Sequence, residues 1–348
     1  MRSKEGFIVH VPVGWKIALA ALAWLLLIWW GHYALNGDRK DRPTVRMGYM
    51  PVITNLAAPI LDYVSKDGAG IRFDAIKFAS FAEMGEALRN GSIQAAFIIA
   101  PLSVVLHQQG ANVRIVYIGN RHESTLVYRK DLNISSFLDL SGKTIAVPLR
   151  YSGHNICARR LAEQYGVQGS NLNIVEMNPP DMPPALASGA LDAYFVGEPF
   201  AAKTVQAGES RVLYYVEQVW PKFICNLLLV KEEFIRNQPD RAAMLVQGAA
   251  RSGYWAKNNT KEAAGIASKY WNQPAELVEY ALQTPSNRIV FDEFVPKEEE
   301  IQFLADQMVK FKLLENNSIT GLVDSRSAKS ADLTGCNTLE SILIPPRK

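Results

Sequence analysis

The sequence predicts an α/β protein with two lobes and parallel-rich sheets, preceded by one N-terminal transmembrane helix. Short apolar runs typical of strands alternate with amphipathic stretches of helical period, and this alternation occurs in two series along the chain. A strand, a helix and a second strand form a parallel unit, so each series predicts a parallel sheet with helices on both faces. The third observation is an unbroken apolar run at residues 17–30.

The composition is that of a globular protein and gives no case for nucleic acid as a partner. The chain has 348 residues, of which 48% are apolar and 20% are charged. This length leaves room for two domains after a leader. The formal net charge is only +3 and no basic stripe alternates with aromatic residues. The sequence therefore lacks the electrostatic pattern of a nucleic-acid-binding surface.

The leader comprises residues 1–42, and its apolar run predicts a membrane span at about residues 15–35. The unbroken run alone also suits the core of a cleaved signal peptide, but with its aromatic edges it reaches the length of a bilayer. Residues 32–34 are a poor cleavage site, so we favour an uncleaved anchor. Charge does not orient the span, because three basic residues precede it and three follow it: Arg2, Lys4, Lys16, Arg39, Lys40 and Arg42.

The first α/β series begins at residue 44. Ser80 is expected to cap its second helix, and Asn90-Gly91 follows that helix as a stop signal. Strands are expected at residues 44–49, 71–78, 93–99 and 113–119, and helices at residues 56–66, 81–89 and 100–110.

The second series follows an extended segment at residues 125–127. We place one lobe at residues 43–127 plus 224–348, with a helical C-terminal part, and the other lobe at residues 128–223. Strands are expected at residues 144–147, 173–177, 193–196, 212–216 and 224–230, and helices at residues 153–165, 182–188, 198–207, 232–237, 239–258, 261–270, 274–283 and 296–311.

Five turns follow a strand and open a helix, at residues 51–55, 100–103, 151–155, 178–182 and 197–200. Ligands of open α/β sheets bind outside the carboxyl ends of the strands, so two facing lobes would direct these turns into one cleft. Their main-chain N–H groups, hydroxyls and amides suit a compact oxyanion. The candidate side chains are Thr54, Asn55, Ser103, Ser152, Asn155 and His154, and Pro101 opens one of the helices.

The turn that contains His154 organises this site. Ser152 or Asn155 is expected to cap the helix, Gly153 allows the backbone to approach a ligand, and His154 lies in an exposed first turn. A helix start has unpaired N–H groups and a partial positive charge, which attract a small anion. His154 adds a donor there, and a full charge if its ring is protonated. The alternative is a strand–helix turn with a surface histidine.

The sequence gives no support for catalysis, a cofactor or a metal site. The sequence has three cysteines, Cys157, Cys225 and Cys336, with no C-x-x-C pair and no zinc-like spacing to histidine. We expect them to pack in the core, and a single disulfide between two of them is the alternative. The motifs of serine hydrolases, zinc proteases, phosphate loops and dinucleotide-binding folds do not occur. We therefore predict a protein that is not an enzyme.

Four segments resemble the nitrate/sulfonate/taurine group of ABC-transporter substrate-binding proteins, in a resemblance that extends from about residue 45 to about residue 323. They are Gly48-Tyr49-Met50-Pro51 and the segments at residues 142–148, 179–182 and 189–199. The resemblance implies a two-lobed periplasmic-binding-protein-like fold of type II. It also implies that a small ligand is delivered to a permease driven by ATP.

The same resemblance implies particular ligand contacts. The Gly-His-Asn turn resembles the ligand-binding turn of both the nitrate and the sulfonate branches, which makes His154 a ligand donor. Pro179 matches a cleft-lining proline of the nitrate/bicarbonate branch, Glu198 lies in a Gly-Glu-Pro segment similar to that branch, and Lys222 falls near a basic position of nitrate binders. Phe97 stands where that branch has a polar amide, which leaves room for a sulfonate or another organic anion.

We therefore expect the extracytoplasmic solute-binding component of an ABC importer. It would capture a small anion such as nitrate or a sulfonate, including taurine, and deliver it to the permease and its ATPase subunits. The N-terminal helix would tether the body to the inner membrane on the periplasmic side. The alternatives are a thiamine-pyrimidine-precursor binding protein, a synthase-like enzyme of related fold, whose family has a cysteine-rich iron motif that this chain lacks, and a membrane-tethered sensor.

Overall fold

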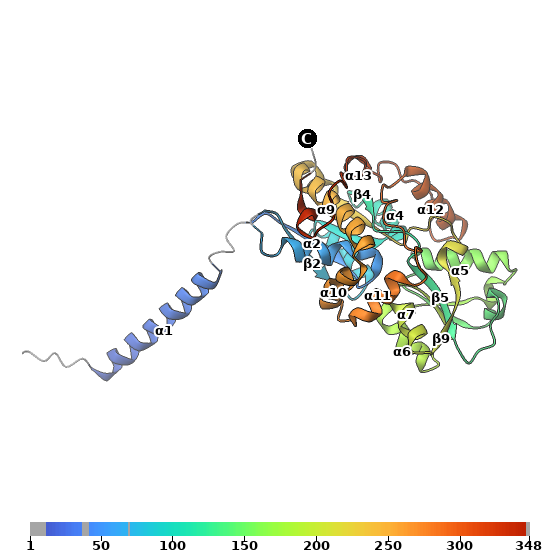
Figure 1. Ribbon diagram of the computed structural model, residues 1–348, viewed down its shortest axis with the longest axis horizontal. Coiled ribbons are helices and arrows are strands. Elements are labelled where there is room, and N and C mark those ends of the chain that lie inside the picture. Colours follow the sequence, from blue (N-terminus) through green and yellow to red (C-terminus); the bar gives the residue numbers. More distant parts are fainter. Residues whose placement is uncertain (1–11, 37–41, 69, 346–348) are drawn as a thin grey trace, which may run out of the picture. The chain divides into compact units, whose positions relative to one another are not determined.

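The computed structural model describes residues 12–36, 42–68 and 70–345 (Figure 1). The chain divides into two units, Met1–Pro43 and Thr44–Lys348. In the first unit the described residues form one helix, α1 (Val13–Asn36), of which Val13–His32 is long and apolar enough to cross a membrane. A signal sequence has the same properties. Residues 1–11 and 37–41 of the predicted leader, with four of its six basic residues, lie outside the described residues.

The first half of the second unit is built on a five-stranded sheet with the order β2-β1-β3-β10-β4. β1 is parallel to β2 and β3, whereas β10 is antiparallel to β3 and β4 because it enters the sheet from the other half. The strands are β1 (Thr44–Tyr49), β2 (Arg72–Lys77), β3 (Ala95–Ile99), β4 (Val113–Ile118) and β10 (Asn226–Lys231).

Two groups of helices pack around this sheet. One group includes α2, α9 and α10, and the other includes α3, α4 and α12. Ser80 caps α3 by accepting a hydrogen bond from the Glu83 amide, as predicted. The helices are α2 (Ala57–Ser65), α3 (Phe81–Arg89), α4 (Ala100–Gln108), α8 (Glu232–Asn237), α9 (Pro239–Asn258), α10 (Thr260–Trp271), α11 (Ala275–Gln283), α12 (Glu298–Lys310) and α13 (Arg326–Lys329), with short 3-10 turns η2 (Ile53–Asn55) and η7 (Glu340–Leu343).

The second half is built on a sheet with the order β7-β6-β8-β5-β9. β6 is parallel to β7 and β8, and β5 is antiparallel to β8 and β9. The strands are β5 (Ser124–Arg129), β6 (Thr144–Val147), β7 (Asn173–Glu176), β8 (Ala193–Gly197) and β9 (Ser210–Tyr215). The helices are α5 (Gly153–Gln164), α6 (Met182–Ala187) and α7 (Phe200–Gln206), with the 3-10 turns η3 (Phe137–Leu140), η4 (Gly169–Asn171), η5 (Pro179–Asp181) and η6 (Val216–Gln218).

The predicted order of strands and helices is confirmed, with two informative differences. The helix expected from residue 198 begins at Phe200, because the Glu198 amide is bound by the backbone and carboxylate of Glu123 and so stays with the strand end. The boundary expected after Val127 falls inside β5, all of which pairs within the second sheet. The chain therefore passes between the sheets at about residues 119–123 and 223–225.

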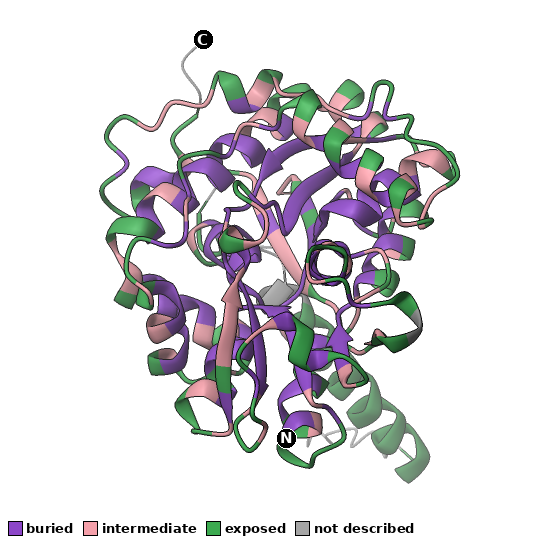
Figure 2. Ribbon diagram, turned by 90° about the vertical axis from the view of Figure 1, so that its right-hand side faces the viewer, coloured by how far each residue is buried: buried purple, intermediate pink, exposed green. Residues whose placement is uncertain are grey.

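Buried residues occur in the strands and helices of both halves (Figure 2). One continuous apolar cluster contains Val52 and Leu102 from the first half together with Met182 and Phe200 from the second. The two halves are therefore packed against each other in this structure.

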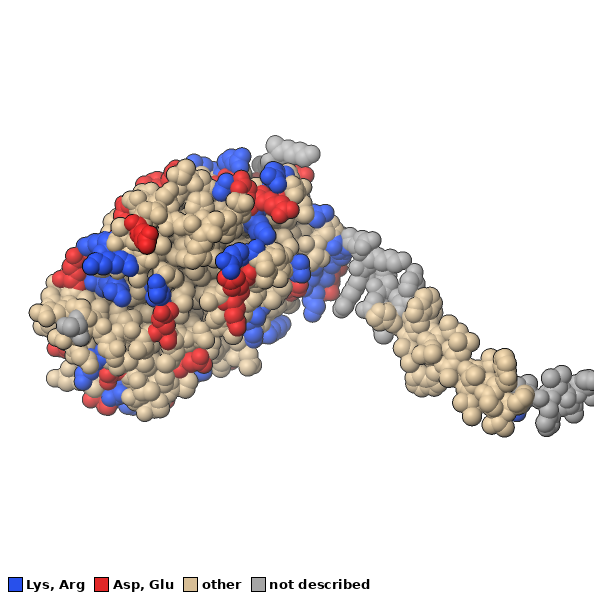
Figure 3. Space-filling view, turned by 180° about the vertical axis from the view of Figure 1, so that it is seen from behind, with Lys and Arg blue, Asp and Glu red and all other residues tan. Residues whose placement is uncertain are grey.

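Phe97 is fully buried, and the three cysteines are free and buried, as expected for core residues. On the face seen in Figure 3, basic and acidic side chains are interspersed.

A close backbone contact between the turn after β1 and the end of β4, both in the first half, predicts a strong effect of one glycine. A Cβ atom on Gly119 would lie 2.0 Å from the Thr54 carbonyl oxygen, and backbone cannot yield cheaply. We expect Gly119→Ala to lower the free energy of unfolding by about 1–3 kcal/mol. Gly265→Ala is the control, because nothing lies within 4 Å of its Cβ and it stands inside α10, where alanine gains up to ~1 kcal/mol. Urea unfolding of both variants checks the prediction; equal effects would contradict it.

Candidate functional site

The turns at the strand ends meet where the two sheets face each other. The Ile53 amide, in the turn after β1, donates to the Glu198 carbonyl, after β8, at 2.8 Å. The Ala100 amide, at the end of β3, donates to the Cys225 carbonyl of the second crossover at 2.9 Å. These hydrogen bonds join turns that are far apart in sequence into one junction, which includes most of the predicted ligand contacts.

His154 lies inside this junction and not on the surface. Its side chain is packed between the rings of Phe195 and Phe223, and the residue is only 1% exposed. Its Nε2 atom is 2.9 Å from the Ser124 hydroxyl and 3.8 Å from Cys225 Sγ. Burial lowers the pKa of the imidazole to about 3, so the ring is neutral near pH 7. The expectation of an exposed histidine in the first turn was wrong.

Tertiary packing of the helix start explains this burial. A Cβ atom on Gly153 would lie 2.6 Å from the Phe223 ring, so glycine here serves a close contact with the second crossover. Ser152 caps α5 by accepting from the Asn155 amide, as one of the two expected alternatives. The Asn155 side chain instead donates to the Arg150 carbonyl at 2.6 Å and accepts from Arg159. Gly153, Ser152 and Asn155 thus shape the turn.

The turns of the first half supply one uncommitted hydroxyl. The Asn55 side chain is engaged on both sides, donating to the Met50 carbonyl and accepting from Asn226. The Ser103 hydroxyl donates to the Ala100 carbonyl at 2.6 Å, and Pro101 is buried in the first turn of α4. Thr54 differs, because its Oγ1 is buried and has no hydrogen-bond partner. An orphaned buried hydroxyl of this kind is what a ligand can satisfy.

Two buried carboxylates lie at the other wall of the junction. Glu198, a predicted contact, accepts from the Thr125 hydroxyl at 2.7 Å and from the Ala202 amide at 2.8 Å, so it also caps α7. Glu123 accepts from the Glu198 amide at 2.8 Å. Burial raises the pKa of both carboxyls, to about 7 for Glu123, while Arg288 acts in the opposite direction on Glu198. Sequence reasoning missed Glu123, because nothing in its local pattern indicates burial.

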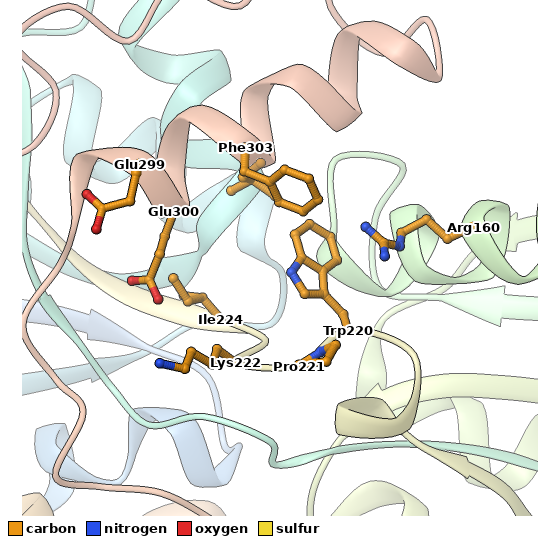
Figure 4. Close-up of a pocket in the computed structure, with 9 residues that line it drawn as sticks. Arg160, Trp220, Pro221, Lys222, Ile224, Glu299, Glu300 and Phe303 are labelled. Atoms are coloured by element: carbon orange, nitrogen blue, oxygen red, sulfur yellow. The ribbon is translucent and has the colours of Figure 1, made fainter.

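The basic residue that the structure brings to this wall is Arg288 and not Lys222. The Arg288 side chain is 3% exposed and its Nη1 is 3.9 Å from Glu198 Oε1. The Lys222 side chain is 60% exposed, and its Nζ is 3.8 Å from Glu293. Lys222 lines a different cavity, of about 380 Å³, on the side of the crossovers, with Trp220, Phe303 and Arg160 on its walls (Figure 4).

A second cavity opens between the two halves. It has a volume of about 480 Å³ and adjoins the predicted turn at residues 178–182, although Pro179 itself is buried and does not line it. The lining residues are Ser80, Phe81, Ala82, Pro148, Leu149, Glu176, Met177, Asn178 and Asp181. Among the described residues there is no group of three or more histidine, cysteine or acidic side chains that could hold a metal ion.

Comparison with known proteins gives the family. The model of the NMT1-like family matches residues 38–269. The chain belongs to the NMT1-like family. A putative aliphatic sulfonates-binding protein of Bacillus subtilis is 25% identical over 352 residues, which cover 94% of this chain and 97% of that protein.

Solved structures share the fold. The ligand-binding component of an ABC-type import system from Staphylococcus aureus superposes with a TM-score of 0.76 at 20% identity, covering 84% of this chain and 100% of that one. The periplasmic nitrate-binding protein of Synechocystis PCC 6803 superposes with a TM-score of 0.73 at 16% identity, covering 83% and 88%. At these identities the likeness establishes the fold, and the predicted α/β fold with two parallel-rich sheets is confirmed.

The buried neutral His154 predicts a pH-dependent contribution to stability. Because the pKa in the folded protein lies below its unfolded value of about 6.5, the unfolded state binds more protons as the pH falls below 6.5. The contribution of His154 to the free energy of unfolding should therefore decline by about 2 kcal/mol from pH 7 to pH 5. His154→Gln keeps a donor but does not titrate, so the difference in unfolding free energy between parent and variant should shrink by this amount. A difference that stays constant with pH would contradict the neutral ring.

Proposed function

We propose that this member of the NMT1-like family is the extracytoplasmic solute-binding component of an ABC importer. It takes a small anion, such as nitrate, taurine or another sulfonate, between its two halves and delivers it to the permease and ATPase subunits. The observation that carries the proposal is the meeting of strand-end turns from both halves at one buried junction. The names of the relatives, a sulfonate-binding and a nitrate-binding protein, support the ligand class.

The chemistry of the junction favours recognition of an anion by neutral donors. α4 and α5 begin at these strand ends, and the first amides of a helix have no partner inside the helix. Of these amides, Ala100 N–H donates to the Cys225 carbonyl and Asn155 N–H donates to the Ser152 hydroxyl. The Thr54 hydroxyl is a donor without a partner, and the His154 ring is held neutral. Such groups bind an oxyanion without bringing a mobile counter-charge into the site. Thr54 and His154 are therefore the polar side chains that we assign to the ligand, with the backbone of the five turns.

Opening and closing of the two halves complete the proposal. We place the lobes at about residues 44–123 plus 224–348 and at about residues 124–223, which join through two crossovers. Because the turns of both lobes are packed together in this structure, a solute reaches them only when the lobes separate.

Catalysis has little support, since burial raises the pKa of the Cys225 thiol well above its usual range, which removes the nucleophilic thiolate.

Calorimetry on the body lacking residues 1–43 tests the ligand class. We expect a nitrate or sulfonate to bind, and Thr54→Val, which removes the free hydroxyl at constant shape, to weaken binding by about ten- to a hundredfold, the value of a hydrogen bond to a charged group. Ser103→Ala is the matched control, because the Ser103 hydroxyl already donates its hydrogen bond to the Ala100 carbonyl. If none of these anions binds the parent body, the ligand class is wrong.

We also propose that α1 stays attached and anchors the body at the inner membrane, with the body on the periplasmic side. The apolar length of Val13–His32 supports an anchor. The protein purified from membranes is expected to keep this helix in its intact mass, and removal of residues 1–36 should release the body into the soluble fraction. A mature N-terminus between residues 32 and 44 would show instead that the helix is a cleaved signal.

A further inference from the structure

A segment of the first half extends across to the second half beside the two crossovers. It consists of residues 284–295, between α11 and α12. Its Val290 exchanges two backbone hydrogen bonds with Arg121 of the first crossover, at 2.9 and 3.2 Å. The Arg121 side chain, 1% exposed, in turn donates to the Glu293 carbonyl and to Glu300. The segment is thus fixed to the zone about which the two halves would move.

Arg288 is the residue through which this segment contacts the second half. Its Nε donates to both oxygens of Glu217 at 3.1 and 3.2 Å, and its Nη2 donates to the Ser124 carbonyl. The guanidinium lies 4.5 Å from the centre of the Tyr215 ring. Its Nη1, which has no hydrogen-bond partner, is 3.9 Å from Glu198 Oε1. A planar guanidinium holds its N–H donors in a fixed arrangement, so it is suited to bind several partners at once in a defined geometry.

These contacts connect Arg288 with the proposed ligand site on two sides. The carbonyl of Ser124 accepts from Arg288, and its hydroxyl, which donates to Glu123, lies 2.9 Å from His154 Nε2. Glu198, which Arg288 faces, gives its carbonyl to the Ile53 amide of the opposite half. Removal of a buried guanidinium would leave the carboxylate of Glu198 without its nearest cation. The position of Arg288 therefore affects both walls of the junction at once.

We propose that Arg288 is a positioning residue for solute binding, which fastens the 284–295 segment to the second half and holds Glu198 and Ser124 in place at the junction. For its effect on binding the proposal rests on the proposed function. The effect of Arg288 on Glu198 does not rest on the proposed function, so an experiment can distinguish failure of this proposal from failure of the proposed function. Arg288 does not contact the solute in this proposal, so its role is distinct from that of Thr54 or His154.

The charge environment of Glu198 provides a test that needs no solute. Glu198 is faced by Arg288, by Glu123 beside β5, by Tyr194 of β8 and by Tyr215 of β9. Burial raises the pKa of Glu198, so the folded state binds its proton more tightly than the unfolded state. The free energy of unfolding therefore declines as the pH rises through a window that begins at the unfolded pKa of about 4.3 and ends at the raised pKa of the folded state. Loss of Arg288 removes the cation that lowers this pKa, so the window should extend to higher pH.

The first arm measures urea unfolding of the full chain in detergent across this pH range. Arg288→Gln should move the upper end of the window to higher pH, Arg288→Lys, which keeps the charge, should move it little, and the shift should vanish in Arg288→Gln/Glu198→Gln. Arg326→Gln, on an exposed arginine paired with Asp324, is the matched control and should leave the window unchanged. If Arg288→Gln destabilises the protein without moving the window, the guanidinium is merely structural and the proposal is overturned.

The second arm measures affinity for the anion that binds the parent. Arg288→Gln should weaken binding on the order of tenfold, and Arg288→Lys should recover part of it. Glu217→Gln should weaken binding less, and in the double variant Arg288→Gln/Glu217→Gln the loss should be smaller than the product of the two. Unchanged affinity in Arg288→Gln overturns the positioning role in binding. If the parent binds no anion while the pH window still shifts, the proposed function has failed and the Arg288–Glu198 coupling stands.

Discussion

The burial of charged groups where the two halves meet is the constraint on which the rest of the structure depends. Arg121, Glu123, Glu198 and Arg288 are all less than one tenth exposed. An unpaired ion in such surroundings costs several kcal/mol, so each of these groups requires partners. The partners come from different segments: the two crossovers, the turn after β8, and residues 284–295. The junction is consequently defined only when all these segments are in place.

This constraint also decides the chemistry that the junction can offer. The positive charge of Arg288 is already shared between Glu217 and Glu198, and His154 is held neutral by burial. In the proposed function, an anion is therefore met by the backbone of the strand-end turns, by the Thr54 hydroxyl and by the neutral His154 ring. The nearby carboxylates would repel a bare anion unless it lies against those donors, which gives the site a means of selecting orientation as well as charge.

The order of elements could be predicted from sequence because it depends on local signals. The apolar runs of β1, β3 and β8, the Ser80 cap and the glycines after helices mark their elements directly, and the helical C-terminal part from α8 to α12 was placed within a few residues. The start of α7 was misplaced because the Glu198 amide is bound by Glu123, which is distant in sequence. The lobe boundary was misplaced because β5 obtains both of its neighbours from later parts of the chain.

The sequence by itself determined the two α/β series, the apolar helix at the N-terminus, and the turns at which a ligand would be held, since each of these is encoded by hydrophobic period and by the residues that start and stop helices. Only the tertiary structure decided which polar side chains in those turns are available. His154 is buried because Phe195 and Phe223 approach it from other segments. The side chains of Asn55 and Ser103 already make internal hydrogen bonds. Arg288 and Glu123 enter the junction from positions without any local motif, because burial and pairing are properties of the folded chain and not of a sequence window.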